Sequence, residues 1–148
     1  MPIEETTRAD VLCTIRQLFM DSQSRDRESA LRDLANSLGY SRLGPRIREV
    51  LSKDLLTAVR RGILQNVRGQ MSLVTRDMRN YTRESLKADF LTALGKGWVN
   101  RDEAIRCFAR FLGFARTGSN IEDISRSLIK GLRRESRLEG RADHIRRM

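Results

Sequence analysis

Apolar residues recur along this chain with the three-to-four-residue spacing of amphipathic helices. One such stripe near the start consists of Val11, Leu12, Ile15, Leu18 and Phe19. A matching stripe in the second half consists of Leu86, Phe90, Leu91 and Leu94. Two further helical segments follow each stripe, so the pattern predicts a mainly α-helical protein of two three-helix parts.

The two parts repeat each other at an offset of 74 residues. Residues 27–50 align with residues 101–124, and the apolar and glycine positions of the two segments coincide. So many coincidences at one offset indicate two copies of a single unit. We therefore predict two domains, residues 1–76 and residues 77–148.

Capping residues mark the helix boundaries within each copy. The second helix begins after Asp26 or Asn100, whose side chains are good N-caps, and ends at Gly39 or Gly113. The third helices are expected at about residues 46–61 and 120–138. The predicted core includes Leu31, Leu34, Leu38, Ile47, Ile105, Phe108, Leu112 and Ile121.

Strand signals complete the predicted fold. Residues 63–74 are typical of a β-hairpin with Arg68-Gly69 at the turn. Its apolar residues of equal parity, all at odd-numbered positions, are Ile63, Val67, Met71 and Leu73. Trp98-Val99 is expected to give a short strand, whereas residues 139–148 are short and basic, so we expect the second hairpin to be missing or reduced to a tail. This order predicts tandem winged-helix-like three-helix units, with a small β-hairpin wing in the first copy.

Composition argues against most enzyme classes. The 148 residues contain one histidine, His144, close to the C-terminus, and two cysteines, Cys13 and Cys107, that cannot make a four-ligand zinc site. No phosphate-binding glycine motif occurs. We therefore expect no catalytic residues, no cofactor and no metal site. The acidic N-terminus and the absence of long apolar runs predict a cytoplasmic chain without a membrane partner.

Charge indicates the kind of partner. There are 29 basic and 19 acidic residues, a net charge of +10. On the last helix the basic residues fall on one face, without an acid between them, which favours contact with a line of phosphates. In the first copy three arginines surround the start of the third helix, the part that enters the major groove in helix-turn-helix proteins. The predicted nucleic-acid-binding residues are Arg42, Arg46, Arg48, Lys53, Arg60, Arg68, Arg116, Arg126, Lys130, Arg133, Arg134 and Arg137.

A short segment at the start of the third helix carries a family resemblance. The run is Arg116-Thr117-Gly118-Ser119-Asn120-Ile121, and more loosely Arg42-Leu43-Gly44-Pro45-Arg46-Ile47. It resembles an uncharacterised, winged-helix-like domain at the C-termini of bacterial superfamily-one helicase and nuclease-like proteins. The likeness covers most of residues 82–138 and, less closely, residues 27–64, with Asn120 where that family usually has arginine. It implies association with DNA-processing systems and supplies no catalytic residue.

Two functions remain open at this point. The first is a non-enzymatic duplex DNA-binding protein, either a regulator or an accessory module of a DNA-processing system. The alternative is a protein-interaction module that docks onto a larger DNA-processing enzyme through its basic face. Aromatic residues are only 5% of the chain and lie on apolar helical faces, which favours duplex over single-stranded DNA. The sequence leaves the target site and homo-oligomerisation open.

Overall fold

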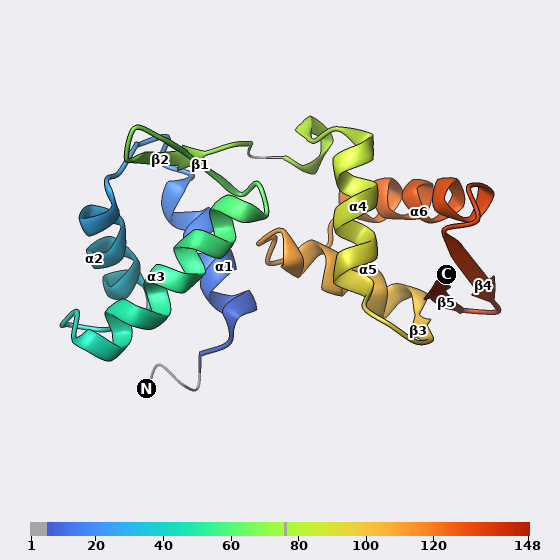
Figure 1. Cartoon of the computed structure of the whole chain (residues 1–148), viewed down its shortest axis with the longest axis horizontal. Helices are drawn as coiled ribbons and strands as arrows, with labels where there is room; N and C mark the ends of the chain where they lie inside the picture. The colour runs from blue at the N-terminus through green and yellow to red at the C-terminus, as the bar shows by residue number, and fades with distance from the viewer. Residues whose placement is uncertain (1–5, 76) are drawn as a thin grey trace. The chain divides into compact units, whose positions relative to one another are not determined.

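A computed structural model describes residues 6–75 and 77–148 (Figure 1). In these residues the structure holds six α-helices and small antiparallel sheets, so the prediction of a mainly helical chain is confirmed. It divides into two compact units: Met1–Arg76 with Leu112–Ala115, and Asp77–Phe111 with Arg116–Met148. None of the described helices has the length and apolar composition needed to cross a lipid bilayer.

The first unit consists of three helices and a hairpin. Its elements are α1 (Arg8–Phe19), α2 (Arg27–Ser37), α3 (Pro45–Arg60), β1 (Leu64–Val67) and β2 (Gln70–Leu73). The side chain of Thr7 caps α1 and that of Asp26 caps α2, while Pro45 opens α3 in the first turn, where its missing N–H costs nothing. These caps fix the helix starts close to where the sequence places them.

The second unit repeats this arrangement. Its elements are η2 (Met78–Asn80), α4 (Arg83–Leu94), β3 (Val99–Asn100), α5 (Arg101–Phe111), α6 (Ser119–Arg134), β4 (Leu138–Arg141) and β5 (His144–Arg147). The sheet order is β3-β5-β4, with Val99 opposite Ile145. In the first unit Arg25 pairs with Met71 in the equivalent place, through two backbone hydrogen bonds of 2.9 and 2.7 Å.

Corresponding elements of the two units have equal lengths. The first helices have 12 residues each, the second 11, the third 16, and all four hairpin strands have four. Apart from the first helix, which is offset by 75, each begins 74 residues after its counterpart. Positions in α3 and in β1–β2 therefore have defined equivalents in α6 and in β4–β5.

Each unit has its own apolar core. In the first, α1, α2 and α3 bury leucines and Phe19 against the hairpin; in the second, Phe90 meets Phe108 edge to face at 5.1 Å. Of the predicted core residues, five are buried: Leu31, Leu34, Ile105, Phe108 and Leu112. Three are only partly buried: Leu38, Ile47 and Ile121. They lie toward helix ends, where the chain turns to the surface.

The expectation that the second unit lacks a hairpin was wrong. Residues expected to form a basic tail fold into β4 and β5, which pair from Leu138 opposite Arg147 to Arg141 opposite His144. Leu138 and Ile145 are 2% and 3% exposed, so two apolar side chains anchor the hairpin to the unit. The polar residues between them point outward, as alternation along a strand requires.

The four apolar residues of equal parity in the first hairpin do not share one buried face. Val67 is 58% exposed, and Leu64, of the opposite parity, is buried in its place. The reason is the two-residue turn at Arg68 and Gly69, whose φ values of 54° and 84° are typical of a tight hairpin turn. That turn sets Val67 opposite Gln70 and Leu64 opposite Leu73, and the register leaves Val67 outside.

Candidate nucleic-acid interface

The exposed face of α6 is basic from Arg126 to its end. Arg126, Lys130, Arg133 and Arg134 are exposed, whereas Leu128, Ile129 and Leu132 are buried in the core of the second unit. This segregation follows from the helical period, which places residues three and four apart on one side. The sequence-predicted stripe is therefore on the surface.

These four cations have no salt-bridge partner among the residues that the structure describes. The nearest acid beyond the helix, Glu135, is held instead by Lys87 of α4, whose Nζ donates to both carboxylate oxygens at 2.9 and 3.0 Å. This hydrogen bonding holds the pKa of Glu135 below its ordinary value. The carboxylate of Glu135 is therefore already paired with a cation outside the basic face of α6.

The basic face of α6 adjoins the second hairpin. The guanidinium of Arg133 lies against Gly140 of β4, so close that a Cβ built on Gly140 would be 2.8 Å from Arg133 Cζ. Arg141, the next residue, is exposed at the end of β4. Helix and hairpin thus present positive charge side by side.

Arg137 does not lie on the helix as the sequence predicted. The helix α6 ends at Arg134, and Ser136 takes a left-handed conformation with φ of 59°, which turns the chain toward β4. Arg137 is exposed in this link, with its Nη1 4.0 Å from Glu135 Oε1. The stripe on α6 therefore consists of four cations, with Arg137 beyond its end.

In the first unit, most of the predicted cations on α3 contact acids. Arg48 donates to both oxygens of Glu28 on α2, at 2.8 and 2.6 Å, which holds the pKa of Glu28 below its ordinary value. Glu49 contacts two more of these cations and lies 3.6 Å from Arg46 and 3.5 Å from Lys53. These pairs are solvent-exposed, so each contributes little to stability, but together they lower the positive charge of α3.

The remaining predicted residues lie on loops, at the end of α3 or at the hairpin turn. Arg42 and Arg116 are exposed in the loops that lead into α3 and α6, Arg60 ends α3, and Arg68 forms the turn of the first hairpin. Arg42 also lines a hollow of about 400 Å³ with Arg32, Arg48 and Tyr40. The start of α3 therefore keeps positive charge around it, although Arg48 is engaged with Glu28.

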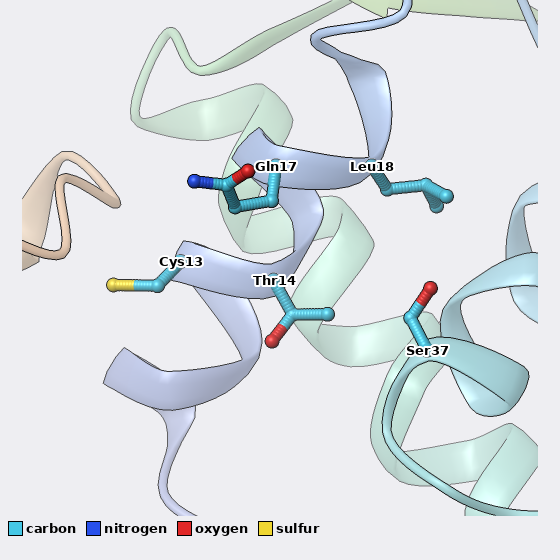
Figure 2. A pocket seen from close by; sticks show the side chains of 5 residues that line it. All are labelled: Cys13, Thr14, Gln17, Leu18 and Ser37. Carbon is cyan, nitrogen blue, oxygen red and sulfur yellow. The ribbon is translucent and has the colours of Figure 1, made fainter.

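A second hollow in the first unit offers no converging chemistry. Figure 2 shows its lining, in which Cys13 and Gln17 point away from Ser37 and Leu18. Cys13 is partly buried, and Cys107 on α5 is exposed. Within residues 6–75 and 77–148, no three histidine, cysteine or acidic side chains are grouped to hold a metal ion.

Sequence reasoning missed the basic residues of the second hairpin. Arg141 and Arg147 are exposed, and Arg146 stacks its guanidinium 4.7 Å from the ring centre of Trp98, which is itself 41% exposed. The repeat already indicated this hairpin, because an offset of 74 carries Leu64 and Met71 of the first hairpin onto Leu138 and Ile145.

Comparison with known proteins adds no relative: no family model, curated protein or solved structure matches this chain.

Proposed function

We propose that this chain is a non-enzymatic protein that binds duplex DNA through two winged-helix units. Each unit has three helices followed by a hairpin, which is the element order of that fold. In each unit a residue just before the second helix also pairs with the last strand of the hairpin: Arg25 with Met71, and Val99 with Ile145. In proteins that bind DNA through a helix-turn-helix, the later helix lies in the major groove. The helices α3 and α6 are the equivalent elements here.

The observation that carries the proposal is the unpaired basic face of α6. Arg126, Lys130, Arg133 and Arg134 lie on one side of a helix, without salt-bridge partners among the described residues, beside a hairpin that adds Arg141. Concentrated positive charge of this kind binds phosphates and releases counterions, without regard to base sequence. The second unit is therefore the backbone clamp.

The first unit contributes the start of α3. Arg42 and Arg46 are exposed there, and arginine suits bidentate contact with guanine or phosphate. We propose that this end of α3 reads bases while α6 holds the backbone. The resemblance of residues 82–138 to a C-terminal domain of helicase-like and nuclease-like proteins supports a place in a DNA-processing system, as a regulator or an accessory module.

Duplex binding at increasing salt concentration tests the proposal. A fluorescently labelled duplex of random sequence is titrated with the full chain, and log K is plotted against log salt. With about five phosphates contacted, the slope is expected near −4 to −5. The double variant Lys130→Ala/Arg134→Ala is expected to flatten the slope by about two units, because two phosphate contacts are lost.

A charge-matched variant provides the control. Arg79→Ala/Lys96→Ala removes two exposed cations outside the basic face of α6 and is expected to keep the slope of the unmodified chain. Equal loss in both variants would mean that net charge alone attracts DNA. Absence of duplex binding at low salt would favour the alternative function, in which the basic face meets an acidic surface of a larger DNA-processing enzyme.

A further inference from the structure

A small apolar groove opens between α3 and the hairpin of the first unit. It has a volume of about 250 Å³ and is lined by Arg27, Ser52, Leu55, Leu56, Val59, Asn66 and Met71. Leu56 is 51% exposed, which is unusual for a leucine beside a core. The groove is too small for most small-molecule ligands, whose pockets are typically about 300–1,000 Å³. It suits a single large side chain.

The equivalent positions of the second unit are basic. At the offset of 74, Ser52 corresponds to Arg126, Leu56 to Lys130 and Val59 to Arg133. Three of the four cations on the basic face of α6 thus have uncharged counterparts on α3. The equivalent faces of α3 and α6 therefore differ in chemistry: the face of α6 suits phosphates, and the face of α3 suits apolar contact.

The difference at Val59 explains why the groove is open. In the second unit the long side chain of Arg133 crosses to Gly140 of β4 and covers the space between helix and hairpin. In the first unit the shorter Val59 and the polar Asn66 stand at these positions. Ser52 Oγ is buried and has no hydrogen-bond partner among the described residues, although such groups are nearly always bonded.

We propose that this groove binds a short acidic segment of a partner protein, which inserts one large apolar side chain beside Leu56. Charge selects this occupant. Arg60 lies four residues after Leu56 on the same helix face, and Arg27 of α2 lines the groove itself. Acidic residues flanking the inserted side chain would pair with these cations. A second copy of this chain is disfavoured, because each copy carries a net charge of +10.

The proposal does not depend on DNA binding. Leu56 and Val59 offer nothing to a phosphate, so the groove and the basic face of α6 are separate surfaces with separate partners. The chain would then bind a partner protein through this groove while it binds duplex DNA through α6 and the start of α3.

Selection from a random peptide library tests the proposal. Phage displaying random 12-residue peptides are selected on the immobilised full chain, and the enriched peptides are synthesised with a fluorescent label. We expect them to share one large apolar residue with aspartate or glutamate close by. Anisotropy titrations then compare the unmodified chain with Leu56→Lys, which places the residue of the second unit in the groove.

Leu56→Lys is expected to weaken peptide binding at least tenfold. The control Val74→Lys changes another exposed apolar residue, 46% exposed and outside the groove lining, and should bind within twofold of the unmodified chain. Val59→Arg is a second test, since its side chain should cover the groove as Arg133 does. Each variant is checked for an unchanged melting transition. If only one of Leu56→Lys and Val59→Arg remains folded, the peptide affinity of that variant tests the proposal.

Other results would overturn the proposal. These are a library without an acidic-apolar class, or peptides that bind both groove variants normally. Self-association that Leu56→Lys abolishes would instead make a second copy the occupant. Duplex titrations distinguish this proposal from the proposed function. Leu56→Lys should keep DNA binding, whereas Lys130→Ala/Arg134→Ala should weaken it, with a salt slope flatter by about two units, and keep the peptide.

Discussion

Arg48 of α3 donates through both terminal nitrogens to the two carboxylate oxygens of Glu28 in α2, at 2.8 and 2.6 Å. The pair joins two helices of the first unit across 20 residues of sequence. It also occupies the arginine that the sequence assigned to DNA at the start of α3. Whether Arg48 contacts DNA therefore depends on whether it exchanges a carboxylate for a phosphate.

Glu28→Gln is expected to strengthen duplex binding. The substitution removes one negative charge and releases Arg48, so an added phosphate contact should make the salt slope steeper by about 0.9 units. Asp77→Asn serves as the control, because it removes the same charge but frees Arg79 of the second unit, which is not one of the proposed DNA-binding residues, and should leave the slope unchanged. An unchanged slope for Glu28→Gln would assign Arg48 to helix packing alone.

The two units are expected to respond differently to loss of arginine. Arg46→Ala should cost about 1–3 kcal/mol on a preferred sequence and little on random DNA, as loss of a base contact does. Arg133→Ala/Arg137→Ala should weaken every duplex alike and flatten the salt slope by about two units. Selection of binding sites from a random DNA pool provides the preferred sequence. Equal weakening on all duplexes by both variants would make α3 a second backbone clamp.

Asp54 is expected to lower stability at neutral pH. It is buried in α3 with Arg8 Nε 3.0 Å from its carboxylate, and burial raises the pKa of this carboxyl in spite of the arginine. A raised pKa in the folded state stabilises the protein at acid pH, and this contribution is lost as the pH rises through that pKa.

The variant Asp54→Asn removes this dependence and keeps an acceptor for Arg8. In urea unfolding it should be more stable than the unmodified chain at neutral pH, and the difference should vanish at about pH 3, below the ordinary aspartate pKa. A deficit of equal size at both pH values would show that hydrogen-bond geometry, not burial of charge, decides the role of Asp54.

Gly131→Ala is expected to stabilise the second unit. Alanine within a helix is favoured over glycine by about 1 kcal/mol. A Cβ at this position would meet Arg83 Nη2 at 2.8 Å, but Arg83 is an exposed, flexible side chain held by two 3.1 Å hydrogen bonds to Ser127. We expect a net gain of about 0.5 kcal/mol in thermal unfolding. A loss of about 1 kcal/mol or more would mean that Arg83 cannot move aside.

Much of the fold could be predicted because its determinants are local. Asp26 and Asn100 accept hydrogen bonds from the first turns of α2 and α5, and glycines with positive φ follow the ends of these helices. The second hairpin was missed because its two buried apolar residues, Leu138 and Ile145, stand among arginine, glutamate and glycine, which rarely signal a strand. The second hairpin becomes apparent when residues 64–73 are aligned with residues 138–147 at the offset of 74.

The candidate site was less predictable because it depends on tertiary contacts. The exposure of the α6 cations follows from periodicity, whereas the Arg48–Glu28 pair requires α2 to pack on α3. The partnership of Lys87 with Glu135 likewise joins residues 48 positions apart. The sequence spacing shows which charged side chains share a helix face. It does not show which of them form salt bridges with residues of another helix.

The backbone pairing of Arg25 with Met71, and that of Val99 with Ile145, has a consequence for folding. Each pair is 46 positions apart (71 − 25 and 145 − 99) and joins the stretch before a unit's second helix to its last strand. Closing such a loop costs entropy that only the completed core repays, so these contacts form late. The amide hydrogens of Arg25 and Met71 should therefore exchange with solvent only when the whole first unit opens.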